Sequence, residues 1–264
     1  MKKSERLLEV KNLIKRFDGI LALNKVSFEI CADEIVSLIG PNGAGKTTLF
    51  NIITGLLPSN SGSVIFKDST LNGLPPFRIT RKGIARTFQD LHLFGRLSVL
   101  ENVMVAMSHQ VGEDLVTPFL RWRRVDDEEK KLRDRAFSLL DFVGLKEKSN
   151  LSAESLSYGQ MKLLSCARAL ATTIHHENSL ILLDEPVAGV HPRMIREIIL
   201  LIKRIREKGA TVLFIEHNIH VVMEISDRVI VLNAGEKIAE GIPAEIQRNP
   251  QVIAAYLGHR KYAA

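Results

Sequence analysis

Short apolar runs alternate with amphipathic segments along much of this chain. The runs at 35–39, 180–183 and 211–215 contain no charged residue, as is typical of parallel strands that are buried on both faces of a sheet. Residues 192–208 lie between two of these runs, and their pattern predicts a helix that ends at Gly209. A strand, a helix and a further strand in this order predict an α/β fold built on a parallel sheet.

The pattern changes in the middle of the chain. Residues 7–14 and 26–30 alternate or cluster apolar side chains as strands do, with a turn predicted at 15–19 between them. From Ser98 onward the apolar residues follow helical spacing instead. We therefore expect an all-helical block over residues 89–171, between two strand-rich halves.

Composition narrows the class of protein further. The 264 residues are 45% apolar, enough for a sizeable core, and no apolar run reaches the roughly 20 residues that a membrane-spanning helix needs. No apolar run follows the first basic residues, so we expect no signal peptide. Cys31 and Cys166 lack metal-ligand spacing, which favours small buried residues in a reducing compartment.

The formal net charge of +6 does not choose a partner by itself. Basic residues are scattered among 30 acidic ones, without the aromatic-interleaved basic stretches of single-strand nucleic-acid binders. A mild positive balance suits an anionic membrane surface equally well. Charge alone leaves both open, but the lack of such stretches gives no reason to expect a nucleic-acid partner. We expect a protein that is soluble and cytosolic or held to a membrane only through a partner.

The glycine-rich stretch at 40–48 is the strongest chemical motif. It matches G-x-x-x-x-G-K-[ST], with a predicted strand before it and a predicted helix after it. Glycines let backbone N–H groups turn toward a phosphate, and the helix N-terminus adds partial positive charge. Lys46 can reach the β- and γ-phosphates of a nucleoside triphosphate, and the Thr47 hydroxyl can ligate Mg²⁺. The predicted nucleotide-binding residues of this phosphate loop are Gly40, Pro41, Asn42, Gly43, Ala44, Gly45, Lys46, Thr47 and Thr48.

An acidic pair follows the apolar run at 180–183. Asp184 and Glu185 lie at the carboxyl end of that predicted strand, where ligands bind in open α/β sheets. Asp184 is suited to hold Mg²⁺, directly or through water. Glu185 could orient and deprotonate an attacking water molecule. A solvent-exposed acidic pair that simply ends a strand is the alternative.

A second anion-binding motif, the signature turn at 156–160, precedes the acidic pair. It places a serine hydroxyl and glycine N–H groups at the start of a predicted helix. One γ-phosphate hardly needs two such sites in one small chain, so each site could serve a different nucleotide across a symmetric dimer. A plain N-capped helix is the alternative. The residues predicted to contact nucleotide here are Ser157, Gly159 and Gln160.

With these motifs in place, the chain resembles the ATP-binding cassette (ABC) transporter ATPases over essentially its whole length. The motifs occur in that family's order: the phosphate loop, Gln89 after a strand, the signature turn, Asp184-Glu185 and His217. Five motifs in one order are highly specific. A small-molecule P-loop kinase would leave the signature turn and His217 unexplained.

The resemblance implies a fold and a domain organisation. The fold would be a P-loop NTPase (RecA-like) core with an antiparallel β subdomain and an inserted all-helical subdomain. Residues 1–88 and 172–264 would form the core and the β subdomain. Residues 89–171 would form the helical subdomain with the signature turn, and all of them together a single domain over residues 1–264.

The resemblance also implies roles for individual residues. Two cassettes would sandwich two ATP molecules head to tail, each site pairing one subunit's phosphate loop with the other's signature turn. Gln89 would contact Mg²⁺ and the lytic water at the hinge to the helical block, and His217 would hydrogen-bond the γ-phosphate. Phe17 resembles the aromatic residue that stacks on adenine. Packing in the core is the alternative for both Phe17 and His217.

Three segments depart from the family's usual pattern or have no implied role. His191 occupies the position of a usual Asp, which leaves its contact across the dimer open. The stretch 172–178 is longer than usual, and its residues 175–177 favour a surface loop over a metal site. Residues 121–135 are almost all charged, which predicts a solvated helix or an exposed insertion, with partner binding as the alternative.

Within the family, the chain is most similar to the ATPase subunits of branched-chain amino-acid importers, in particular the larger of the two. The similar residues lie at 85–89, 93–94, 97–103, 188–192, 215–217, 225–228 and 249–258. The resemblance implies an ATPase at the cytoplasmic face of the membrane. Its partners would be a second, identical or homologous, ABC ATPase subunit, integral permease subunits and, indirectly, an external solute-binding protein. Urea importers, lipopolysaccharide exporters and soluble ABC proteins acting on ribosomes or DNA are the alternatives.

Overall fold

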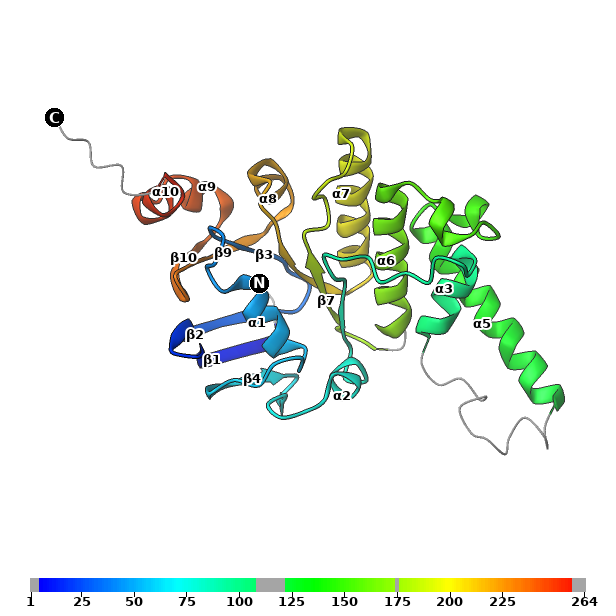
Figure 1. Cartoon of the computed structure of the whole chain (residues 1–264), viewed down its shortest axis with the longest axis horizontal. Coiled ribbons are helices and arrows are strands. Elements are labelled where there is room, and N and C mark those ends of the chain that lie inside the picture. The colour runs from blue at the N-terminus through cyan, green and yellow to red at the C-terminus, as the bar shows by residue number, and fades with distance from the viewer. Residues whose placement is uncertain (1–4, 108–121, 174–175, 258–264) are drawn as a thin grey trace.

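The computed structural model describes residues 5–107, 122–173 and 176–257, and within them two β-sheets lie beside a separate group of helices (Figure 1). The smaller sheet contains β1 (Arg6–Phe17), β2 (Ile20–Cys31), β4 (Ser61–Phe66) and β5 (Ser69–Thr70). The larger sheet contains β3 (Ile35–Ile39), β6 (Ile84–Arg86), β7 (Leu180–Asp184), β8 (Thr211–Ile215), β9 (Arg228–Asn233) and β10 (Glu236–Gly241). The helices are α1 (Lys46–Ile53), α2 (Pro76–Thr80), α3 (Val99–Ala106), α5 (Trp122–Phe142), α6 (Tyr158–Thr173), α7 (Pro192–Glu207), α8 (Ile219–Ile225), α9 (Pro243–Gln247) and α10 (Pro250–Leu257), with short 3₁₀ turns at Lys146–Lys148 and Ala153–Ser155.

The antiparallel sheet begins with a longer hairpin than the sequence predicts. β1 and β2 pair as far as Phe17 opposite Ile20, so the turn predicted at 15–19 is wrong in extent and contains only Asp18 and Gly19. Both of these residues have positive φ, 42° and 91°, as a two-residue hairpin turn that follows the twist of the strands requires. β4 pairs with the other edge of β1, which completes the order β2-β1-β4-β5.

The larger sheet has the order β10-β9-β3-β8-β7-β6. Its strands from β9 to β6 are parallel, and β10 adds an antiparallel edge. The three apolar runs of the sequence are β3, β7 and β8, and every residue in them is buried. Alternate residues point to opposite faces: Leu182 and Leu213 pack toward α1 and the smaller sheet, whereas Leu183 and Phe214 pack toward α6 and α7. The predicted α/β fold, with its antiparallel β subdomain and inserted helices, is confirmed.

The helical block consists of α3, α5 and α6, which pack on one another beside α7 (Figure 1). Ser98 caps α3 reciprocally with Glu101, since each side chain accepts the other's backbone N–H, at 3.1 and 2.8 Å. In α5, residues 129–135 are mostly exposed while Ala136 and Leu140 are buried, so the predicted solvated helix is confirmed for those residues. Neither α5 nor any other helix of the described ranges is long and apolar enough to cross a membrane.

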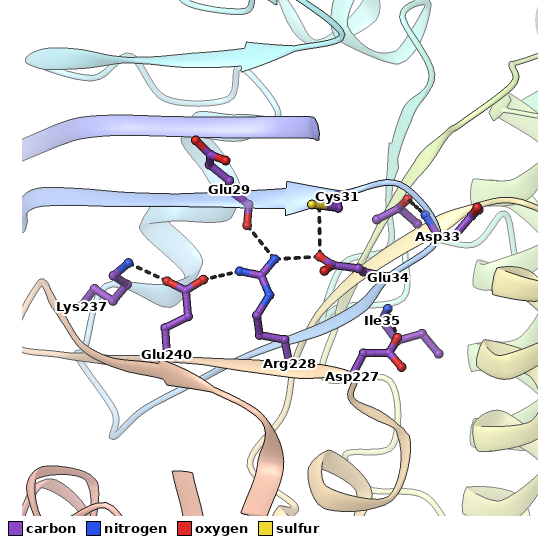
Figure 2. Close-up of polar contacts among 10 residues, drawn as sticks. Glu29, Cys31, Asp33, Glu34, Ile35, Asp227, Arg228, Lys237 and Glu240 are labelled. Atoms are coloured by element: carbon purple, nitrogen blue, oxygen red, sulfur yellow. Dashed lines mark hydrogen bonds and ion pairs between the residues drawn. The ribbon is translucent and has the colours of Figure 1, made fainter. Parts of the chain in front are cut away.

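A polar cluster around Arg228 joins the smaller sheet to the larger one (Figure 2). Arg228, at the start of β9, donates to the Glu29 carbonyl oxygen of β2 at 2.8 Å and to the Glu34 carboxylate at 2.7 Å. It also pairs with Glu240 of β10. The neighbouring Asp227 accepts the Ile35 N–H at 2.8 Å. These contacts fix the position of β2. The backbone of β2 lies next to the phosphate loop, since the Ala22 carbonyl oxygen is close to Gly45.

Candidate ATP site

The phosphate loop joins β3 to α1 at the carboxyl end of the parallel strands. Its backbone passes other segments too closely for a side chain at two of its glycines. A Cβ on Gly40 would lie 2.0 Å from the Leu232 carbonyl oxygen, and one on Gly45 2.6 Å from the Ala22 carbonyl oxygen. Both glycines also have positive φ, 150° and 97°, so other residues would be strained there. Of the remaining loop residues, Asn42, Gly43 and Thr47 are exposed, Pro41 and Thr48 are partly exposed, and Ala44 is buried.

Lys46 begins α1 and folds back over the loop. Its Nζ donates to the carbonyl oxygens of Gly40 and Pro41 at 2.8 and 3.1 Å. Burial lowers the pKa of Lys46, and the nearby carboxylates of Glu185 and Asp184 partly oppose that shift. A phosphate group at the loop would add negative charge beside the Lys46 ammonium and so stabilise its charged form. The predicted phosphate contact is therefore electrostatically favourable.

Asp184 ends β7 and pairs with an arginine to which the sequence assigned no role. Arg86 of β6 donates to Asp184 Oδ2 at 2.8 Å, and both side chains are 5% exposed. The same guanidinium donates to Asn51 Oδ1 of α1 at 2.6 Å. Arg86 therefore connects the acidic strand to the helix that follows the phosphate loop. The signal for it was an arginine in a short apolar strand, whose buried charge requires a partner.

Glu185 and His217 meet because β7 and β8 are neighbours that end at the same edge of the sheet. His217 Nε2 lies 3.3 Å from Glu185 Oε1. Behind them the buried Glu216 accepts the N–H groups of Val187, His217 and Asn218 at 2.8, 3.0 and 3.2 Å. This carboxylate holds together the two loops that carry the pair. The structure thus brings together two residues predicted from motifs 32 positions apart in the sequence.

The signature turn has the reciprocal cap of a helix start. Ser157 Oγ accepts the Gln160 N–H at 3.4 Å, and Gln160 Oε1 accepts the Ser157 N–H at 3.1 Å. Ser157 is exposed and Gly159 is buried. Across the described ranges, no hydrogen bond or ion pair joins this turn to the phosphate loop of the same chain. Within one subunit the two predicted anion sites therefore have no direct polar contact.

The other predicted residues lie at exposed positions. Phe17 is 40% exposed at the end of β1, and the Lys15 ammonium lies 4.9 Å from its ring centre. The Phe17 ring is therefore not packed in the core. Gln89 is exposed three residues beyond β6. His191 caps α7, since its Nδ1 accepts the Arg193 N–H at 3.3 Å.

The predicted Mg²⁺ ligands are all oxygen donors, the type that Mg²⁺ prefers. They are the Thr47 hydroxyl, the Gln89 amide and the Asp184 carboxylate. One oxygen of that carboxylate, Oδ2, is paired with Arg86. The residues that the structure describes contain no cluster of three or more His, Cys, Asp or Glu side chains that could hold a metal by themselves. The metal alternative at residues 175–177 lies partly outside them.

Comparison with known protein families decides the identity of the fold. The family model described as "ABC transporter" matches residues 23–188. This chain belongs to the ABC transporter family. A second model, "Branched-chain amino acid ATP-binding cassette transporter", matches residues 236–262. The predicted membership of the ABC transporter ATPases is confirmed, and with it the prediction of an ATP-binding cassette that drives transport.

Individual relatives share nearly the whole length of this ABC cassette. The "High-affinity branched-chain amino acid transport ATP-binding protein LivG" of Escherichia coli is 42% identical over 97% of this chain and 99% of its own. The crystal structure of the ADP conformation of MJ1267, an ATP-binding cassette of an ABC transporter, matches with a TM-score of 0.81 and 32% identity, over 97% of this chain and 100% of that one. The cassette MJ0796, solved as a dimer in a post-hydrolysis state with ADP and Pi, matches with a TM-score of 0.73 and 29% identity, over 90% of this chain and 99% of that one.

Proposed function

We propose that this cassette hydrolyses ATP to power the import of branched-chain amino acids through a membrane permease. The observation that carries the hydrolytic part is the Glu185–His217 pair at the end of β7 and β8, at the same edge of the sheet as the phosphate loop. The solute is supported by the similarity to LivG and by the match of residues 236–262 to the branched-chain amino-acid transporter model. Localisation at the cytoplasmic face of the membrane, through the permease, follows from this function.

The proposed chemistry assigns one task to each residue of the site. The phosphate-loop N–H groups and Lys46 bind the β- and γ-phosphates, and Phe17 stacks on the adenine. Thr47, Asp184 and Gln89 would hold Mg²⁺, which neutralises phosphate charge when it is bound. Glu185 orients the attacking water and takes its proton. His217 forms a hydrogen bond with the γ-phosphate, and its contact with Glu185 limits the rotation of that side chain.

The second wall of the site is proposed to come from another ABC ATPase subunit, identical or homologous. Ser157, the Gly159 N–H and Gln160 stand at the start of α6, a helix of 16 residues whose N-terminus favours an anion. These groups make no polar contact with the described phosphate loop of the same chain, and the partner's nucleotide is their proposed ligand. The dimeric form of MJ0796 with ADP and Pi offers a precedent for such an assembly.

A groove beside Gln89 is the proposed dock for a cytoplasmic helix of the permease. It encloses about 230 Å³ between α2, β6 and α6, and Arg86, Phe88 and Arg168 line it. Phe88 is 38% exposed, and the Phe94 ring, 49% exposed, lies with its centre 5.2 Å from Cζ of Arg168. Exposed aromatic rings next to cationic side chains are typical of protein interfaces. The external solute-binding protein would act on this subunit only through the permease.

Reconstitution tests the proposed function. The full chain, purified with its permease subunits in proteoliposomes and supplied with the solute-binding protein, should hydrolyse ATP faster when leucine, isoleucine or valine is present. Stimulation by urea instead, or activity only with lipopolysaccharide, would transfer the cassette to one of the related transporters. Co-purification with ribosomes or DNA and no permease would contradict a transport role.

A further inference from the structure

A buried lysine joins the signature turn to the loop that carries Glu185. Lys162 lies one turn into α6, and the residue is only 5% exposed. Its Nζ donates a hydrogen bond of 2.8 Å to the main-chain oxygen of Glu185, and it lies 5.5 Å from the centre of the Tyr158 ring. A buried ammonium is costly unless fixed acceptors compensate it. This contact therefore holds the two segments in one relative position.

The peptide groups of Glu185 are in a conformation that needs such support. Its φ is 48°, in the left-handed region that disfavours residues with a side chain. Its N–H donates to the Ile215 oxygen at 3.0 Å, and its carbonyl oxygen also accepts the Ala188 N–H at 3.2 Å. Lys162 is the donor to this carbonyl from the helical block. A shift of α6 therefore acts on the backbone from which the Glu185 carboxylate projects.

Close packing beside this hydrogen bond leaves little room for independent movement. A Cβ on Gly159 would lie 2.6 Å from Cγ of Met194 and 3.4 Å from Cγ1 of Val190. A Cβ on Gly189 would lie 3.2 Å from Cε1 of Tyr158. The signature turn thus touches both the loop after Glu185 and the first turn of α7. Densely packed contacts transmit a displacement because they cannot be compressed.

We propose that Lys162 is a positioning residue that couples the two ATP sites of the assembled dimer. The proposal rests on the proposed function, in which the signature turn faces the partner's nucleotide and Glu185 serves the nucleotide of its own subunit. When ATP at the partner's site draws in the signature turn, Lys162 carries that displacement to the Glu185 carbonyl. Glu185 then reaches its hydrolytic position only when both sites are occupied. Lys162 itself touches no substrate.

Substitutions at Lys162 test this coupling in the full chain purified with its permease subunits. Lys162→Met keeps the length of the side chain and removes the donor, whereas Lys162→Arg keeps both donor and charge. Lys203→Met on α7, where the side chain is 41% exposed, is the matched control. The rate of ATP hydrolysis is measured against ATP concentration, which yields kcat, KM and the Hill coefficient.

The wild-type protein and the control should hydrolyse ATP with a Hill coefficient above unity. Lys162→Met should lower kcat about 10- to 100-fold, as a small misplacement of a catalytic group does, with KM within about twofold. Its Hill coefficient should fall to unity, and Lys162→Arg should restore both kcat and the Hill coefficient. If Lys162→Met does not fold, Lys162→Gln, which retains a shorter N–H donor, should show a smaller loss of both.

Three results would overturn the proposal: a Hill coefficient of unity in the wild type, a Lys162→Met variant that behaves like the control, or a loss of kcat with cooperativity unchanged. Failure of the proposed function looks different, because Glu185→Gln would then leave hydrolysis intact. A second readout separates positioning from nucleotide binding. Lys162→Met combined with Glu185→Gln should still form the ATP-dependent dimer, and loss of that dimer would show a binding role instead.

Discussion

Single side chains of this cassette take their chemistry from neighbours that are distant in the sequence. Glu185 faces His217 because two parallel strands end together, and Asp184 faces Arg86 because a third strand lies alongside. Lys46 is buried near both acidic residues, which partly oppose the fall in its pKa that burial causes. At such short distances, buried charges interact more strongly than charges in water, because the effective dielectric constant is lower.

Glu185→Gln removes the proposed base and keeps the size of the side chain. Hydrolysis should fall by about 10³-fold, which corresponds to roughly 4 kcal/mol of barrier, while ATP binding persists and the ATP-bound dimer accumulates. Single-turnover hydrolysis and size-exclusion chromatography with ATP measure the two effects. An unchanged turnover would remove Glu185 from the role of base.

Arg86→Met leaves the Asp184 carboxylate buried without its partner. Loss of one member of a buried ion pair costs about 3–5 kcal/mol, so the melting temperature should fall by roughly 10 °C or more. Arg206→Met is the matched control, because the Arg206–Asp227 pair is 42% and 44% exposed and such pairs contribute at most about 1 kcal/mol. Equal melting temperatures for the two variants, measured by calorimetry, would show that Arg86 does not stabilise the strand.

At the scale of elements, loops between well-packed strands and helices carry the site. β3, β7 and β8 are wholly buried, and the loops after them present the phosphate loop, Glu185 and His217 at one edge. α7 follows the second of these loops and begins at the His191 cap. His191 therefore has a local structural role at the position where the family usually has Asp.

His191→Ala should destabilise the fold through the first turn of α7. Loss of a side-chain N-cap typically costs about 0.5–2 kcal/mol, so the midpoint of urea unfolding should decrease slightly with an unchanged slope. His191→Asp should keep or raise the stability, because Asp is a preferred N-cap. A midpoint that is the same for Ala and Asp would mean that the cap contributes nothing.

At the scale of the molecule, one core of the large sheet faces the small sheet and another faces the helical block. Besides these apolar contacts, specific polar contacts join the parts: the Arg228 cluster on one side and the Lys162–Glu185 hydrogen bond on the other. Cys166 of α6 is buried in the core between the helical block and the large sheet. Its accessibility to a reagent therefore measures whether these two parts stay packed together.

Thiol labelling should therefore distinguish the two cysteines. Burial raises the pKa of Cys166 to about 12, with the Lys162 charge opposing the shift, and thiolates, not thiols, react. A thiol reagent should label the partly exposed Cys31 in the folded protein, and Cys166 only at the rate of unfolding. Cys31→Ser and Cys166→Ser variants assign the two phases. Labelling of Cys166 as fast as that of Cys31 would show that α6 opens readily.

Some predictions at the level of elements failed in extent, and for a physical reason. The turn at 15–19 was too wide because Lys15, Arg16 and Phe17 continue β1, with Lys15 Nζ bonded to the Pro58 carbonyl oxygen at 2.8 Å. A basic side chain in a strand can donate its hydrogen bond to a carbonyl that is distant in the sequence, and the local sequence pattern does not predict such a bond. β3, β7 and β8 were predicted more closely, because each consists almost wholly of one continuous apolar run.

The amino-acid sequence by itself determined the parts of this protein whose physics is local. Apolar runs define the buried strands, the glycines of 40–48 allow a phosphate loop, and Ser157 starts a helix. The tertiary structure alone decided which partners the buried cationic side chains have: Asp184 for Arg86, and the Glu185 carbonyl oxygen for Lys162. Such pairs depend on the order of strands in a sheet and the packing of a helix against it. Those are long-range properties, and the spacing of residues along a chain does not encode them.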